Sequence, residues 1–204
     1  MDIRGCVFDF GGVMTMMTMP DRVRPLVKEL GVDWNILETG FEKYRRQMDG
    51  DMMTIDEMYS RIWADAGVTP DKKTHDRIIE EDMASFLYRN ERTLEFMRTL
   101  KGRGFKIGIL TNMSSTFGVR FRETFSDFIA LADAMVISGE AKLFKPMREI
   151  YDLLRERIGL PAETLCFFDD VEGNCRGARE AGWNIVRFVD NDQAARDFEA
   201  LLAR

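Results

Sequence analysis

The sequence predicts an α/β protein: a Rossmann-like doubly wound parallel sheet with an inserted all-helical cap. Short, continuously apolar runs recur along the chain, as is typical of strands that are buried on both faces of a parallel sheet. Amphipathic helical patterns separate the later runs, and this alternation favours a doubly wound core. Between the first run and Asn90 the pattern is helical only, so helices are expected to interrupt the sheet after its first strand.

The strands and helices of the core follow from these runs in chain order. Strands are expected at Ile3–Phe10, Phe105–Thr111, Ala134–Ser138, Thr164–Asp169 and Asn184–Val189. Helical periodicity predicts core helices at Glu91–Gly102, Lys145–Ile158, Gly173–Gly182 and Asn191–Arg204. Asn90 is the expected N-cap of the first of these helices.

The insert is expected to contain four helices: Arg22–Leu30, Trp34–Met48, Ile55–Ala66 and Lys72–Tyr88. Thr54 and Glu57 have the spacing of a capping box, which predicts the start of the third helix. We therefore expect residues 1–16 and 90–204 to form the α/β core and residues 17–89 to form the helical cap.

Composition narrows the classes of partner. The chain has 204 residues and a formal net charge of −6, and its basic residues are interspersed with acidic ones, so no nucleic-acid partner is expected. No apolar run approaches the ~18 residues of a membrane span, and the N-terminus does not resemble a signal peptide, so no membrane partner is expected either. The three cysteines form no metal-ligand spacing, and we expect a cytoplasmic protein. The sequence is compatible with a monomer or a homodimer.

Polar residues stand where the predicted strands end. They are Asp9 after the first strand, Thr111 and Asn112 at the second, Lys145 shortly after the third, and Asp169 with Asp170 at the fourth. Ligands of an open parallel sheet bind at the carboxyl ends of its strands, so these side chains are expected to lie close together. The sequence thus predicts a polar site at one edge of the sheet.

The residue types at this edge are typical of phosphate chemistry. Three carboxylates around one point repel one another unless a cation offsets them, and their oxygens suit Mg²⁺. A hydroxyl, an amide and an ammonium group beside the metal suit the oxygens of a phosphate. Gly11 and Gly12 allow the backbone to approach a ligand closely. An aspartate beside a metal-bound phosphate can attack it and form an aspartyl-phosphate.

The order of the motifs suggests a family. D-F-G-G-V, then L-T-N-M-S, then K-P, then F-F-D-D-V-E-G-N resembles the four-motif signature of the haloacid dehalogenase superfamily, in its subfamily with a helical cap. Within it the chain is similar to the phosphatases related to the N-terminal domain of soluble epoxide hydrolase. The segment from Gly50 to Glu57 also resembles a cap segment of these proteins.

The resemblance implies a role for each matching residue. Asp9 would be the nucleophile and a magnesium ligand, and the carbonyl of Gly11 would be a second ligand. Thr111, Asn112 and the backbone of Gly12 would bind the phosphoryl oxygens, and Lys145 would offset their charge. Asp170 would bind magnesium, with Asp169 at the metal site in support.

One position departs from the family pattern. Most phosphatases of the superfamily carry a second aspartate two residues after the nucleophile, which serves as the general acid. This chain has Gly11 there. A missing general acid typically costs ~10²–10⁴-fold on poor leaving groups. The sequence leaves four consequences open. The substrate has a good leaving group, a group from the cap serves as the acid, a bound water does so, or activity is lost.

Several other residues are left open by the sequence. The methionines of the stretch Met14–Met19 are expected to pack between cap and core or to line an adaptable pocket. Tyr44, Arg45 and Arg46 are on a charged helix that is either solvated or directed at a substrate. The only histidine, His75, is expected at the surface.

The predicted function is that of a Mg²⁺-dependent phosphatase acting on a small phosphorylated metabolite. A 2-haloacid dehalogenase of the same superfamily is the first alternative, although Asp169 and Asp170 stand where those enzymes usually have serine and asparagine. A catalytically weak phosphate-binding protein is the second. A receiver-type signalling domain is disfavoured, because receivers place their acidic pair first in the chain.

Overall fold

The computed structural model describes residues 1–16 and 18–204 and contains a five-stranded parallel sheet in the order β3-β2-β1-β4-β5. The strands are β1 (Gly5–Phe8), β2 (Lys106–Thr111), β3 (Ala134–Ile137), β4 (Leu165–Asp169) and β5 (Asn184–Arg187). β1 occupies the centre between β2 and β4, with Phe8 opposite Ile109 and Phe168. The predicted fold class is confirmed, since each expected apolar run contains one strand of a parallel sheet.

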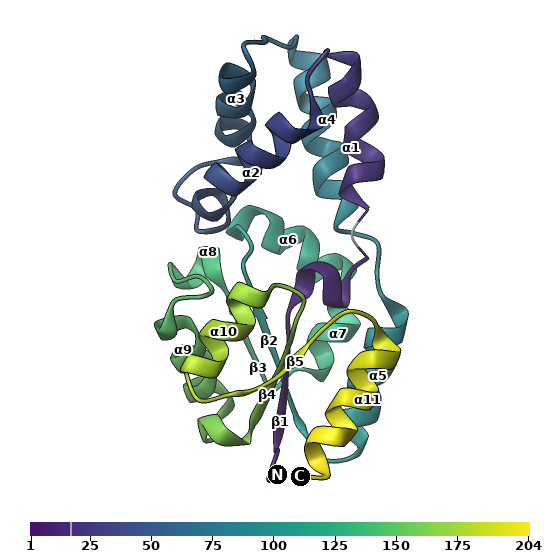
Figure 1. The fold of residues 1–204 in the computed structure, drawn as a ribbon, viewed down its shortest axis with the longest axis vertical. Coiled ribbons are helices and arrows are strands. Elements are labelled where there is room, and N and C mark those ends of the chain that lie inside the picture. The colour runs from purple at the N-terminus through teal and green to yellow at the C-terminus, as the bar shows by residue number, and fades with distance from the viewer. Residues whose placement is uncertain (17) are drawn as a thin grey trace.

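Helices cover both faces of the sheet (Figure 1). One face is covered by α5 (Glu91–Gly102), α7 (Ser126–Leu131) and α11 (Asn191–Leu202), and the other by α9 (Arg148–Ile158) and α10 (Glu172–Glu180). The short α8 (Ser138–Ala141) follows β3 directly. All five strands run in one direction, so their carboxyl ends share one edge, which faces the remaining helices in Figure 1.

The structure differs from the sequence prediction between β2 and β3. Two helices that were not predicted, α6 (Ser115–Thr124) and α7, fill this connection. Ser114 caps α6 by accepting a hydrogen bond from the amide of Phe117. The helix predicted from Lys145 begins three residues later, at Arg148, because Pro146 interrupts the pattern and leaves Lys145 in the preceding loop.

The insert contains α1 (Met19–Glu29), α2 (Trp34–Asp49), α3 (Ile55–Ala66) and α4 (Lys72–Ser85). These helices pack around a hydrophobic cluster of their own, in which Leu37, Tyr59 and Ile62 are fully buried. The capping box at Thr54 and Glu57 is present, as predicted. We refer to α1–α4 as the insert and to the rest as the core; the exact boundaries of the two parts stay a prediction.

The two connections between insert and core run side by side. Thr15 forms an antiparallel bridge with Arg89, and its hydroxyl donates a 2.7 Å hydrogen bond to the carbonyl of Tyr88. The amide of Met16 donates to the same carbonyl. The chain thus enters and leaves the insert through two paired segments near the end of β1. In the described part of the chain, no helix combines the length and the apolar character needed to cross a membrane.

Candidate active site

Two neighbouring strands place the three carboxylates of the site together. Asp9 follows β1, and Asp169 ends β4 immediately before Asp170. The rings of Phe8 and Phe168 stack with their centroids 4.7 Å apart and align the ends of these two strands. Carboxylate oxygens of Asp9, Asp169 and Asp170 lie within 4.8 Å of one another. The sequence prediction that these residues meet at one sheet edge is therefore matched by their positions.

Lys145 lies between two of these carboxylates. Its Nζ is 2.7 Å from an oxygen of Asp9 and 2.7 Å from an oxygen of Asp169, and its side chain is only 1% exposed. The loop that carries Lys145 is held by Asn112, whose amide oxygen accepts from the Lys145 N–H and whose amide nitrogen donates to the Lys145 carbonyl. Asn112 therefore positions Lys145 in the structure, and a direct phosphoryl contact by its side chain stays a prediction.

The carboxylate of Asp169 is engaged on both oxygens. One accepts from the backbone amide of Val171 at 2.8 Å, and the amide group of Asn174 donates to both at 3.1 Å. Together with the ammonium group of Lys145 these donors hold Asp169 in one orientation. Asp169 is thus suited to orient Lys145 and Asn174, while the carboxylates of Asp9 and Asp170 lie closer to the ligand cavity.

Gly12 allows Asp170 to approach the loop after β1. Its φ of +73° lies in the left-handed region, and a Cβ added to it would be 2.5 Å from a carboxylate oxygen of Asp170. Gly11 has an ordinary backbone conformation, and a Cβ there would meet nothing nearer than the ring of Phe86 at 3.9 Å. A side chain at Gly11 would thus have room, whereas one at Gly12 would not. Thr111 is buried at the end of β2, one residue before Asn112.

The electrostatics of the site are those of crowded carboxylates. Burial raises the pKa of Asp9 well above its ordinary value, Lys145 opposes this increase, and Asp169 adds to it. Burial and the neighbouring Asp169 likewise raise the pKa of Asp170. Burial alone would lower the pKa of Lys145, but Asp169 and Asp9 raise it, so Lys145 keeps its charge. Three carboxylates thus face one ammonium group.

This donor set fits a divalent cation. A cation beside Asp9 and Asp170 would balance the two negative charges that Lys145 leaves, and would favour the ionised carboxylates. Oxygen ligands from carboxylates and a backbone carbonyl are those that Mg²⁺ takes. The residues that would hold it are Asp9, the carbonyl of Gly11 and Asp170, with Asp169 behind them.

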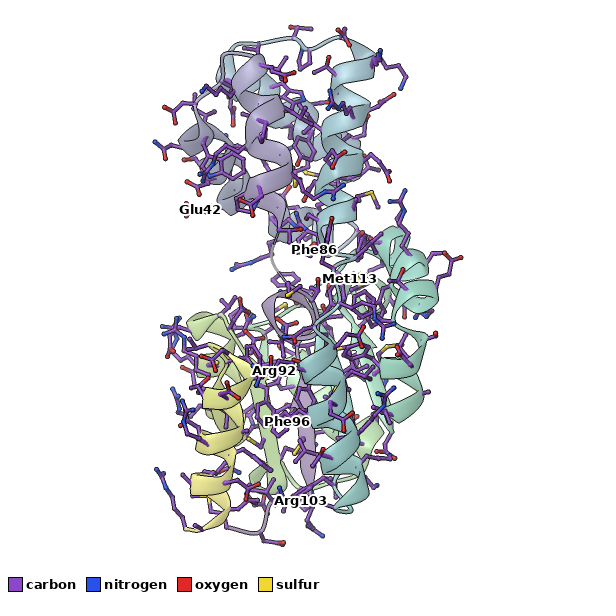
Figure 2. The ribbon with its side chains drawn as sticks, turned by 90° about the vertical axis from the view of Figure 1, so that its right-hand side faces the viewer. Glu42, Phe86, Arg92, Phe96, Arg103 and Met113 are labelled. Carbon is purple, nitrogen blue, oxygen red and sulfur yellow. The ribbon has the colours of Figure 1, made fainter. Side chains whose placement is uncertain are left out.

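A cavity of about 1020 Å³ opens from these residues towards the insert. Asp9, Lys145 and Asp170 line its core side. Apolar side chains line much of its walls, among them Met19, Phe41, Met48, Met52, Met53, Ile55, Met83, Phe86, Met113 and Phe117. Figure 2 shows Phe86 and Met113 where the insert meets the core. A cavity of this size and lining is typical of a site for a small organic ligand.

The residues whose roles the sequence left open take different positions in the structure. Arg45, Arg46 and Met19 line the cavity, whereas Tyr44 donates a hydrogen bond to Asp65 inside the insert. Met14 is buried in the core and Met16 is 52% exposed. Met17 lies outside the described residues.

Three groups at the site were not predicted: two line the cavity, and the third is fully buried. They are Asp49 and Asp82 of the insert, which share the guanidinium group of Arg45, and Ser138 of the core, which holds the end of α2. The resemblance of Gly50–Glu57 to a cap segment was the only signal near Asp49. Asp82 and Ser138 had none, since each acts through contacts with residues distant in the sequence.

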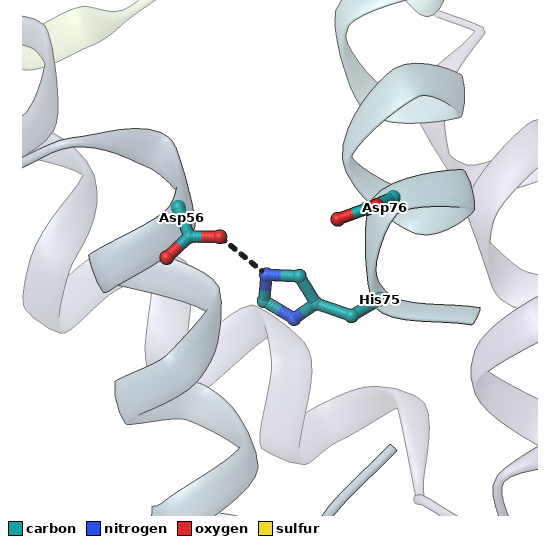
Figure 3. A group of neighbouring side chains, drawn as sticks. All are labelled: Asp56, His75 and Asp76. Atoms are coloured by element: carbon teal, nitrogen blue, oxygen red, sulfur yellow. Dashed lines mark hydrogen bonds and ion pairs between the residues drawn. The ribbon is translucent and has the colours of Figure 1, made fainter. Parts of the chain in front are cut away.

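A second group of possible metal ligands lies in the insert (Figure 3). It consists of Asp56, His75 and Asp76, which belong to α3 and α4. Trp63 donates its indole N–H to Nδ1 of His75 at 2.9 Å, so the proton of the neutral ring is on Nε2, which lies 3.0 Å from Asp56. A metal bound to Nε2 would require the tautomer with its proton on Nδ1. That N–H group would then point at the indole N–H of Trp63. His75 therefore connects α3 and α4, and its side chain is only 12% exposed instead of lying free at the surface.

Comparisons with known proteins identify the family of this chain. The family model described as haloacid dehalogenase-like hydrolase matches residues 3–182. Phosphatase MT3486 of Mycobacterium tuberculosis is 27% identical over 125 residues, which are 61% of this chain and 57% of that protein. An (S)-2-haloacid dehalogenase of Pseudomonas fluorescens is 25% identical over 131 residues, 64% of this chain and 56% of that protein.

Two further similarities concern most of the chain. Bifunctional epoxide hydrolase 2 of Sus scrofa is 24% identical over 215 residues, which cover 98% of this chain but 39% of that protein. The chain thus spans less than two thirds of the length of these three curated relatives. The crystal structure of the family enzyme bt-2542 of Bacteroides thetaiotaomicron, in complex with magnesium and inorganic phosphate, superposes with a TM-score of 0.66 at 20% identity. It covers 90% of this chain and 93% of that one, a likeness of fold.

Proposed function

Because this chain belongs to the haloacid dehalogenase-like hydrolase family, we propose that it is a Mg²⁺-dependent phosphatase of a small phosphorylated metabolite. The observation that carries the proposal is the position of Lys145, whose Nζ bridges Asp9 and Asp169 beside Asp170. This arrangement leaves a nucleophilic carboxylate beside excess negative charge that a cation would balance.

Asp9 performs the displacement in this proposal. Its free carboxylate oxygen attacks phosphorus in line, the bond to the leaving oxygen breaks, and an aspartyl-phosphate forms. Its other oxygen is oriented by the ammonium group of Lys145 at 2.7 Å and the amide of Phe10 at 2.7 Å. A water molecule then attacks phosphorus, releases phosphate and regenerates Asp9.

The surrounding groups bind and shield the phosphoryl group. Lys145 offsets the charge on the transferring oxygens, while Thr111, Asn112 and the backbone of Gly12 bind them. Bound Mg²⁺ would add positive charge for the phosphoryl oxygens. The insert covers the site and excludes bulk water during the first step, which strengthens these interactions.

A dehalogenase is the second candidate, since the chain is 25% identical to a haloacid dehalogenase over 131 residues. Asp9 would then displace halide from carbon without a metal. The excess of carboxylates around Asp9 argues against this function, because uncompensated negative charge there repels a haloacid anion.

The test is phosphate release from a panel of sugar phosphates, 4-nitrophenyl phosphate and acetyl phosphate. It compares added Mg²⁺ with chelator, and Asp9→Asn with Asp2→Asn, a matched change at an exposed aspartate. We expect turnover that needs both Mg²⁺ and Asp9 and that Asp2→Asn leaves intact. Chloride release from 2-chloropropionate in chelator would instead support the dehalogenase. Binding of phosphate without any turnover would support the weak phosphate-binding protein.

A further inference from the structure

The proposed reaction lacks a proton donor on the loop that carries the nucleophile. Gly11 stands where a second aspartate would be, and its backbone offers no acid. In an in-line displacement the leaving oxygen lies on the far side of phosphorus from Asp9. The insert lines the cavity opposite the strand ends (Figure 1), so its side chains are placed to supply a donor for the leaving group.

Among the described residues, seven carboxyl groups line the cavity, and four of them already have another role. Asp9 and Asp170 belong to the nucleophile side. Glu57 caps α3 through the backbone amide and hydroxyl of Thr54. Asp51 accepts from the amide of Ser115 and pairs with Lys142; burial opposes these contacts, but they lower its pKa, so it stays ionised.

Three carboxyl groups of the insert remain: Glu42, Asp49 and Asp82. Glu42 is exposed to solvent. Asp82 is 1% exposed and is oriented inside the insert by the hydroxyl of Tyr59 at 3.0 Å. Asp49 is the last residue of α2, is 13% exposed at its side chain, and lines the same cavity as Asp9 and Lys145.

Asp49 is held in place by the core. The hydroxyl of Ser138 donates a 2.7 Å hydrogen bond to the Asp49 carbonyl and accepts one from the amide of Met113 at 2.8 Å. Two residues on, Asp51 binds the amide of Ser115 at 2.9 Å. These contacts attach the end of α2 to the strand ends of the core, so the position of Asp49 is set relative to the nucleophile.

The surroundings of Asp49 shift the pKa of its carboxyl towards neutral pH. Asp49 and Asp82 lie 3.3 Å and 3.5 Å from nitrogens of the same guanidinium group, that of Arg45, so two carboxylates share one positive charge. Burial raises the pKa of Asp49 to about 6, Arg45 and Lys145 limit the increase, and Asp82 adds to it. Asp51, two residues along the chain, is paired with Lys142. This is the range in which a general acid works best.

We propose that the Asp49 carboxyl of the insert is the general acid that replaces the one missing at Gly11. As the bond between phosphorus and the leaving oxygen breaks, the Asp49 proton moves to that oxygen and the product leaves as a neutral alcohol. The resulting Asp49 carboxylate then accepts a proton from the water that attacks the aspartyl-phosphate, which restores the acid. The inference rests on the proposed phosphatase function and assigns its leaving-group chemistry.

The chain itself offers a rescue experiment. Gly11 has φ −65° and ψ 127°, and a Cβ there would have room, so Gly11→Asp can supply an acid on the nucleophile loop. Four proteins are compared: wild type, Asp49→Asn, Gly11→Asp with Asp49→Asn, and Glu38→Gln as a control at an exposed carboxyl of the same helix. The substrates are 4-nitrophenyl phosphate, phenyl phosphate and an alkyl phosphate, in order of increasingly poor leaving groups.

We expect Asp49→Asn to lower kcat/KM by about 10²–10⁴-fold on alkyl phosphate and by less than about threefold on 4-nitrophenyl phosphate. The fall of kcat above the pKa of the acid should disappear in this variant. Adding Gly11→Asp should restore at least about tenfold on the alkyl ester, which a loss of mere structure would not allow. Glu38→Gln should behave as wild type.

An equal loss on all three esters, or no loss on the alkyl ester, would overturn the assignment of Asp49 while leaving the phosphatase intact. A wild type that turns over only 4-nitrophenyl phosphate would also overturn it, since no acid would then be at work. Failure of the wild type on every ester, with Mg²⁺ present, would overturn both the proposed function and this inference.

Discussion

The hydroxyl of Ser138, which is completely buried at the end of β3, donates a 2.7 Å hydrogen bond to the carbonyl oxygen of Asp49 at the end of α2. The two residues are 89 positions apart in the chain. One core side chain thus holds the part of the insert that faces the nucleophile. The geometry of the cavity therefore depends on this contact as well as on the balance of charges around Asp9.

Ser138→Ala should loosen the docking of α2. It removes the donor to Asp49 and leaves the buried amide of Met113 without its acceptor, which costs about 1–3 kcal/mol of unfolding free energy. Hydrogen exchange of the amides of residues 49–53 should become faster, and kcat/KM should fall. Ser60→Ala, at an exposed serine of α3, is the control and should change neither quantity.

Lys145→Met and Asp9→Asn should separate stability from activity. Removing the ammonium group leaves Asp9 and Asp169 buried without a counter-charge and should cost about 3–5 kcal/mol. Asp9→Asn keeps the pair of Lys145 with Asp169, so it should fold at least as stably as wild type while losing turnover. Urea denaturation measures both, and an equal loss of stability in the two variants would contradict the charge balance described above.

Gly12→Ala should weaken Mg²⁺ binding. The new Cβ would lie 2.5 Å from a carboxylate oxygen of Asp170 and would displace that ligand. Gly67→Ala is the matched control, because Gly67 has nearly the same φ, +69°, but open space around it. Both variants should lose about 1 kcal/mol of stability from backbone strain. In titration calorimetry only Gly12→Ala should raise the Kd for Mg²⁺, by more than about tenfold.

The effect of Asp49→Asn on the unfolding free energy, relative to wild type, should become more favourable as the pH rises. The pKa of Asp49 is about 6 in the folded protein, against 3.8 for an ordinary aspartate side chain, so folding favours its protonated form. That contribution is fully present below pH 3.8 and is lost as the pH rises through 6. Relative to wild type, the unfolding free energy of the variant should therefore increase by about 2 kcal/mol between about pH 4 and about pH 7.5.

Urea denaturation at both pH values checks this, with Glu38→Gln as the control at an exposed carboxyl. A difference between Asp49→Asn and wild type that stays constant with pH would contradict the raised pKa.

The sequence by itself determined the class of fold and the cluster of carboxylates at one sheet edge. Apolar runs and helical periods are local patterns, and parallel strands necessarily place their carboxyl ends on one side. Asp9, Lys145, Asp169 and Asp170 could therefore be brought together from these patterns alone. The helices α6 and α7 could not be predicted in this way, since their short apolar pattern competes with an irregular connection.

Only the tertiary structure decided which residues of the insert face the nucleophile. Periodicity identifies the apolar side of a helix, but the way an insert packs on a core depends on contacts between residues far apart in the chain. Ser138 with Asp49, Arg45 with Asp82, and Trp63 with His75 are such contacts. The burial that gives Asp49 its raised pKa is a result of that packing, because a carboxyl loses its water only where other elements enclose it.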